Sequence, residues 1–108
     1  MRDKIKTTIG TIGADKVNVA GRDFQEKDYS GMSLKKANLS HANFQKANLK
    51  KAVLTEATLE WTNFKEADLT EADLSKAKMF RADFYRATLV SCNFKEAYLG
   101  KANLRFAN

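Results

Sequence analysis

Large apolar residues recur at every fifth position through most of this 108-residue chain. Between residues 34 and 104 the fifth position is Leu ten times, Phe four times and Met once, at Met79. Two residues before each lies a small residue: between 37 and 107 it is Ala at thirteen of fifteen positions, with Thr62 and Cys92 as exceptions. A period of five fits neither an α-helix nor a flat strand. The pattern therefore predicts a chain that turns a corner every five residues, with one large and one small side chain directed inward.

The phenylalanines add a second, longer period. Phe24, Phe44, Phe64 and Phe84 lie twenty residues apart, which is four units of five. Four corners close a square, so each residue is expected above the one twenty positions earlier, at about 4.8 Å, the spacing of paired strands. Rings at that spacing stack favourably when they are offset. The two periods together predict an all-β coil with a column of stacked rings.

The remaining positions of the unit also have physical reasons. The small residue fits a narrow interior, where a larger side chain overpacks the core. The residue between the two inward positions is often Asn or Asp, which bond to nearby backbone and support turns. These residues are Asn38, Asn43, Asn48, Asn63, Asp68, Asp73, Asp83, Asn93 and Asn103.

Units such as residues 37–41 (ANLSH), 47–51 (ANLKK) and 72–76 (ADLSK) resemble the A-(D/N)-L-X-X unit of the pentapeptide-repeat family. The resemblance covers about residues 32–108. It implies a right-handed quadrilateral β-helix, a pentapeptide-repeat solenoid, here with four to five coils of about 20 residues. It implies no single activity, because function depends on sites and not on folds.

One domain is expected, with its β-helix over 17–108. Residues 17–31 form a degenerate first coil, because Val19, Phe24 and Tyr29 continue the register while Arg22 and Lys27 occupy the small position. Residues 1–16 are expected to be an N-terminal cap or a mobile tail. A cap has a clear purpose, because an open coil end presents unpaired strand edges.

Little in the chain suggests catalysis. The only cysteine, Cys92, falls in the small inward position and is interpreted as a buried core thiol. The only histidine, His41, is outward, so the two cannot form a catalytic dyad. No Cys/His cluster has zinc spacing and no glycine-rich loop precedes a helix start. We therefore expect no enzyme activity, no metal and no cofactor. The chain has no signal-like or membrane-spanning apolar run, so we expect a cytoplasmic protein that does not enter a membrane.

Outward aromatic and basic residues share one face of the twenty-residue register. Exposed rings among cations are typical of binding surfaces, so this face is the candidate partner surface. An alternative is that these residues cover the coil or a subunit contact without any ligand, and single-stranded nucleic acid is a less favoured ligand. The candidate residues are Trp61, Lys78, Phe80, Arg81, Tyr98 and Lys101.

The repeat runs in register to Asn108 with no capping element after it. Either a partner covers the last coil, or the native chain continues. We expect a homodimer through this C-terminal coil, which would hide both ladder edges. The resemblance adds weight, since the gyrase-binding members of the family dimerise through this end. The candidate dimer contacts are Tyr85, Val90, Leu99, Leu104 and Phe106.

The sequence thus favours a non-catalytic scaffold or protein-interaction module whose protein partner is unknown. The resemblance offers an alternative, because some members of the family mimic DNA, bind the type II topoisomerase DNA gyrase and protect it from quinolones. Those members are strongly acidic, whereas this chain has a net charge of +6. A basic rod is repelled by the positive DNA-binding surface of a topoisomerase. A basic nucleic-acid-binding module is the third possibility.

Overall fold

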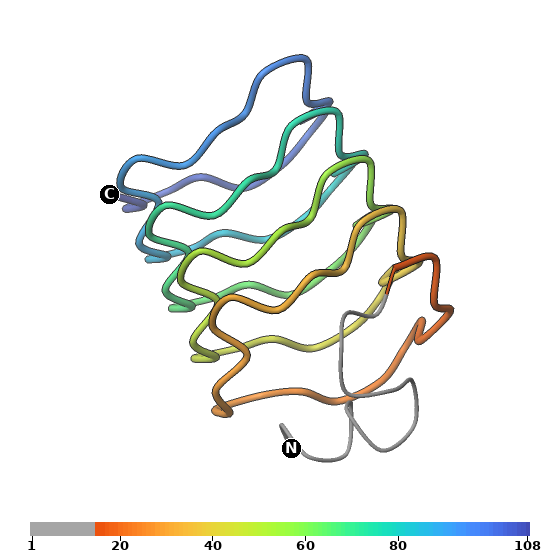
Figure 1. Ribbon diagram of the computed structural model, residues 1–108. Helices are drawn as coiled ribbons and strands as arrows, with labels where there is room; N and C mark the ends of the chain where they lie inside the picture. The colour runs from red at the N-terminus through yellow and green to blue at the C-terminus, as the bar shows by residue number, and fades with distance from the viewer. Residues whose placement is uncertain (1–14) are drawn as a thin grey trace.

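The computed structural model describes residues 15–108, which wind into a stack of four-sided coils (Figure 1). The described residues contain no helix, and their β-structure consists of single bridge positions, not of longer strands. Every bridge is parallel and joins residues twenty apart, from Asn18↔Asn38 to Asp83↔Asn103. The expected twenty-residue coil is therefore confirmed. Within the described range, no helix is long and apolar enough to cross a membrane.

Backbone hydrogen bonds tie each coil to the coils on either side of it. In the unit 47–51, Leu49 and Lys51 donate their N–H groups to the following coil at 2.8 and 2.9 Å, and Asn48 donates back to the preceding coil at 2.9 Å. The next units repeat this scheme. Because buried backbone groups must be paired, the ladder explains how a coil without long strands remains stable.

The other two N–H groups of a unit are satisfied at the corner. Ala47 closes a turn by donating to the carbonyl of Phe44 at 3.0 Å. Lys50 donates its N–H to the side-chain oxygen of Asn48, also at 3.0 Å. The Asn or Asp therefore acts as an Asx-turn residue, as its position in the repeat predicted.

Each corner contains a residue in the left-handed backbone region. The φ angles at these positions lie between +55° and +74°, yet only Gly21 and Gly31 among them are glycines. Such a conformation costs an L-residue about 1–2 kcal/mol. The backbone N–H groups of these corner residues donate to the next coil, as that of Lys51 does. These hydrogen bonds offset the conformational cost of the corner.

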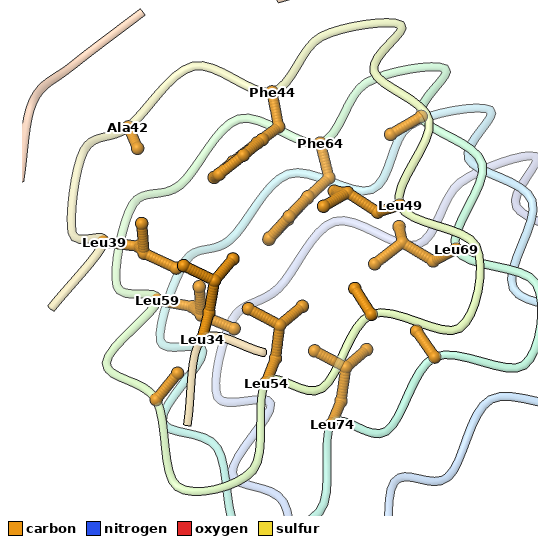
Figure 2. Packing of buried hydrophobic residues seen from close by; sticks show 14 of the residues in the cluster. Leu34, Leu39, Ala42, Phe44, Leu49, Leu54, Leu59, Phe64, Leu69 and Leu74 are labelled. Atoms are coloured by element: carbon orange, nitrogen blue, oxygen red, sulfur yellow. The ribbon is translucent and has the colours of Figure 1, made fainter. Parts of the chain in front are cut away.

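The large residues fill the interior in vertical columns (Figure 2). Phe24, Phe44, Phe64 and Phe84 form one column, with successive ring centroids 5.0, 5.6 and 4.9 Å apart. The predicted phenylalanine stack is confirmed. Tyr29 packs edge-on against the first two rings at 5.7 and 5.9 Å. Its burial, followed by the charge of the nearby Asp23, raises the tyrosine pKa to about 12.

Thr62 and Cys92, the two residues that replace Ala in the small position, each pair their side-chain donor with a backbone carbonyl. The Thr62 hydroxyl donates to the carbonyl of Leu39, and the Cys92 thiol donates to that of Leu69, both at 2.8 Å and both 23 residues back. A hydroxyl or thiol in this slot therefore replaces Ala without leaving a buried donor unpaired.

The first coil explains how large residues are tolerated in the small position. Arg22 and Lys27 are exposed, while Phe24 and Tyr29 remain buried. Lys16 already donates its N–H to the carbonyl of Lys35 in the next coil. The predicted cap or tail over 1–16 lies outside the described residues, apart from its last two positions.

Candidate interaction surface

The corner positions of three sides of the coil mix acidic and basic residues from one coil to the next. The fourth corner has no acidic residue. We call its side the aromatic–basic face and define it by the units 37–41, 57–61, 77–81 and 97–101, which contain one acidic residue, Glu60. The three mixed columns are Glu26–Lys46–Glu66–Arg86, Lys51–Glu71–Ser91 and Lys36–Glu56–Lys76–Glu96, and the fourth is His41–Trp61–Arg81–Lys101.

Four rings form a continuous ladder along the aromatic–basic face. The rings of His41 and Trp61 are nearly parallel, with centroids 6.1 Å apart. Trp61 meets Phe80 edge-on at 6.5 Å, and Phe80 stacks on Tyr98 at 6.4 Å. Half of Trp61 and 57% of Tyr98 remain exposed. These rings thus lie in contact with one another while a large part of their surface faces solvent.

Arg81 links the two halves of this ladder. Its guanidinium carbon lies 5.1 Å from the Trp61 ring centroid and 5.5 Å from that of Phe80. Both distances fall within the range of cation–π attraction. Since the flat guanidinium group packs on rings, its N–H donors are held in position instead of sweeping through solvent.

Of the six predicted surface residues, the structure joins Trp61, Phe80, Arg81 and Tyr98 directly. Lys78 and Lys101 belong to the same face, in the coils of Phe80 and of Tyr98. His41 was not among the six predicted surface residues. Its position twenty residues before Trp61 could have predicted that the two rings stack.

The backbone of this face also differs from the others. Its first unit has the usual cap, from Asn38 to the N–H of Ser40 at 3.1 Å. The corresponding slots above it hold Thr58, Lys78 and Tyr98, none of which caps the corner. Consequently the backbone N–H groups that such a cap would satisfy, those of Glu60, Phe80 and Gly100, have no partner within residues 15–108.

A second group of apolar residues lies at the C-terminal coil. Tyr85 and Phe106 pack edge-on at 5.7 Å, and Arg86 lies over both rings, 5.3 and 5.9 Å from their centroids. Phe106, Val90 and Leu104 are exposed, whereas Leu99 packs partly buried against the core. In the described part of the chain, ladder N–H groups lack partners at Ser91, Phe94, Glu96, Leu99, Lys101, Leu104 and Phe106.

The sequence predicted a buried core thiol at Cys92, and in the structure this residue is partly buried and packs against the core. Desolvation raises the pKa of its thiol to about 11, although a backbone hydrogen bond from Ala72 opposes the shift. The thiol therefore stays protonated near neutral pH and is a poor nucleophile. The side chains of residues 15–108 bring together no group of three metal-ligating residues.

The comparisons with known proteins agree on the fold. The family model for pentapeptide repeats (8 copies) matches residues 33–70 and 67–105. A search of curated proteins finds no match. Rfr23, a pentapeptide repeat protein from the cyanobacterium Cyanothece 51142, is similar in structure, with a TM-score of 0.78 and 20% identity over 98% of this chain and 90% of that one.

A second similar structure is QnrB1, a plasmid-mediated fluoroquinolone resistance protein. Its TM-score is 0.53 at 11% identity, over 86% of this chain and 72% of that one. At these identities the likeness concerns the fold alone. The fold is thus the predicted right-handed quadrilateral β-helix.

Proposed function

This chain belongs to the pentapeptide-repeat family, and we propose that it is a non-catalytic protein-interaction module. Because a fold does not by itself imply an activity, the proposal rests on the outer surface of the chain. The observation that carries this proposal is the ring ladder of the aromatic–basic face. Trp61 and Tyr98 are half exposed, although large aromatic side chains usually gain free energy by burial. A partner that covers them would recover this free energy, and Trp, Tyr and Arg are the residues that most often dominate such contacts.

The arrangement of the ionisable residues supports a role without catalysis. His41 stacks on Trp61, and the Cys92 thiol donates to a main-chain carbonyl inside the coil with a raised pKa. A general base must lie within hydrogen-bond reach of the group it activates. These two side chains lie on different sides of the coil, in units centred on Leu39 and Phe94.

Charge argues against the DNA-mimic alternative. A mimic of DNA needs a continuous negative stripe, but each mixed corner contains Lys or Arg as well as Glu, and the fourth corner has no acid. The net charge of +6 has the same sign as a DNA-binding surface. The surface of this chain therefore lacks the charge pattern that DNA mimicry requires.

Affinity capture with matched variants tests the proposal. The wild-type chain, a Trp61→Ala/Phe80→Ala variant and a Lys51→Ala/Thr70→Ala control on another side of the coil serve as baits. We expect a captured protein that the ring variant loses and the control retains. Equal capture by all three baits, or capture of nucleic acid that nuclease treatment removes, would contradict a protein-binding role for this face.

We also propose a homodimer through the C-terminal coil. The Tyr85–Phe106 pair and the exposed side chain of Val90 support it, since a two-fold contact would cover these apolar groups. Light scattering at micromolar concentration should give twice the monomer mass, and Phe106→Asp should halve it. A monomeric mass for both chains rejects the dimer and leaves the proposal for the aromatic–basic face intact.

A further inference from the structure

We infer that the aromatic–basic face binds an extended, acidic protein segment, with Arg81 as the central contact for its carboxylates. This inference rests on the proposed function and names the chemistry of the partner. It follows from which parts of the rings are free, which charges surround them, and which backbone groups remain unpaired.

The Trp61 ring has neighbours from the coils before and after it. His41, from the preceding coil, stacks against it at 6.1 Å, and Arg81, from the following coil, lies 5.1 Å from its centroid. Phe80 likewise has Arg81 and Tyr98 as neighbours, at 5.5 and 6.4 Å. Nucleobases bind protein rings face to face. A nucleobase would have to displace these neighbours to stack on the central rings, whereas a ligand that contacts ring edges would not, which disfavours single-stranded nucleic acid.

The same edges suit carboxylates. The edge of an aromatic ring carries partial positive charge, and the same face holds the cations Lys78, Arg81 and Lys101 with Glu60 as its single acid. The Arg81 guanidinium, which contacts both rings, has a planar fork that matches a carboxylate with two parallel hydrogen bonds. The charge of this face is thus complementary to an acidic partner.

The unpaired backbone supplies further donors. In most other units the side-chain oxygen of an Asn or Asp accepts a hydrogen bond from the N–H two residues later. The equivalent N–H groups of Glu60, Phe80 and Gly100 have no such partner. Carbonyl or carboxylate oxygens of an extended segment could take the place of that side chain. From the coil of His41 to that of Tyr98 is three steps, about 14 Å at strand spacing. An extended segment of about five residues covers this distance.

The single tryptophan of the chain provides the measurement. Trp61 lies at the centre of the ladder, so its fluorescence reports occupation of this face. The probes are an acidic peptide of three Glu-Gly-Phe-Asp repeats, its neutral counterpart with Gln and Asn in place of the acids, and a single-stranded oligothymidine. We expect saturable binding of the acidic peptide, at least about tenfold tighter than that of either other probe.

Two variants test the role of Arg81. Arg81→Ala should lower the affinity for the acidic peptide about tenfold or more. Arg81→Lys should lower it almost as much, because Lys has no planar fork of N–H donors. Lys76→Ala, which removes the same charge from a corner flanked by Glu56 and Glu96, should leave affinity within about twofold. Circular dichroism of the three variants confirms that each remains folded.

The outcomes separate this inference from the proposed function. If the acidic and neutral peptides bind equally, the face is a protein-binding surface without charge selectivity and only the inference is overturned. If the oligothymidine binds more tightly than either peptide, both fail. Absence of any response to the acidic peptide, or an unchanged affinity in Arg81→Ala, also overturns the inference.

Discussion

The ring of Tyr98 occupies the space in which a β-carbon at Gly100 would lie. In the preceding coil the position twenty residues before Gly100 is Phe80, on which Tyr98 stacks at 6.4 Å. The absence of a side chain at Gly100 therefore allows Tyr98 to fold across the face and extend the ring ladder by one member. No positive φ is recorded at this glycine, unlike at Gly21 and Gly31, so its value lies in the space it leaves.

Gly100→Ser should consequently separate binding from stability. The new side chain displaces Tyr98 from Phe80. We expect this displacement to lower the affinity of the aromatic–basic face for its partner several-fold. The stability should change by less than about 0.5 kcal/mol, as for most surface substitutions. Urea unfolding and Trp61 fluorescence titration measure the two effects. Loss of stability without loss of binding would show that Tyr98 serves the coil instead of the surface.

The inward and outward positions of one unit predict opposite tolerance to the same side chain. Ala72 is 1% exposed inside the coil, so Ala72→Leu should destabilise by about 1–3 kcal/mol or more through overpacking. Glu71 is exposed, and Glu71→Leu should change stability by less than about 0.5 kcal/mol. Equal urea midpoints for these neighbouring variants are incompatible with the assigned register.

The left-handed corners predict a cost that involves no contact. Gly31 has a φ of +70° and open space around its missing β-carbon. Gly31→Ala places an L-residue in a conformation that costs about 1–2 kcal/mol, partly offset by about 0.4–1 kcal/mol of lost freedom in the unfolded chain. A net loss of about 0.5–1 kcal/mol is expected from thermal or urea unfolding. A gain in stability would mean that the corner is not left-handed in solution.

The Asx corners predict loss of stability in acid. The Ser75 hydroxyl, 2.6 Å from Asp73 Oδ1, is the main cause of the lowered pKa of Asp73; desolvation opposes it and the Ser75 N–H adds to it. At Asp68, desolvation raises the pKa, but hydrogen bonds from Thr70 and the charge of Lys50 outweigh it, so the pKa is also lowered. Both groups therefore stabilise the fold above their unfolded pKa, and this contribution is lost as pH falls through the folded pKa.

Asp68→Asn/Asp73→Asn tests that sign. Asn in this slot still accepts the corner N–H, as Asn43 and Asn63 do at 3.0 and 2.9 Å. The wild-type urea midpoint should fall between about pH 5 and about pH 3, and the double variant should lose less over the same interval. If the urea midpoints of both proteins fall equally with pH, the loss of stability in acid comes from other carboxylates.

Much of the fold follows from the sequence because few conformations satisfy two periods at once. The columns of Phe44 and Phe64, the Ala slots and the Asx corners were all predictable from spacing. The left-handed φ of the corner residues was not, because Lys51 or Glu66 in that position carries no local signal for it. Gly21 and Gly31, two glycines in one repeat position, were the available hint.

The candidate surface was predictable only in part. The twenty-residue register placed Trp61 and Arg81 in one column, but not the packing of the guanidinium between two rings. Side-chain packing depends on rotamers that no periodicity encodes. The N–H groups left unpaired at Phe80 and Gly100 required knowledge of which atom caps each corner. The partner surface and dimer contacts remain predictions.

Photocrosslinking tests the central claim most directly. A benzophenone amino acid is placed at His41, beside Trp61 in the aromatic corner, or at Glu71, in the mixed corner on the opposite side of the coil. Both positions are exposed. The proposed function predicts a protein adduct from the His41 position that is lost with Trp61→Ala and absent from the Glu71 position. Equal adducts at both positions, or an adduct at His41 that only nuclease removes, would contradict it.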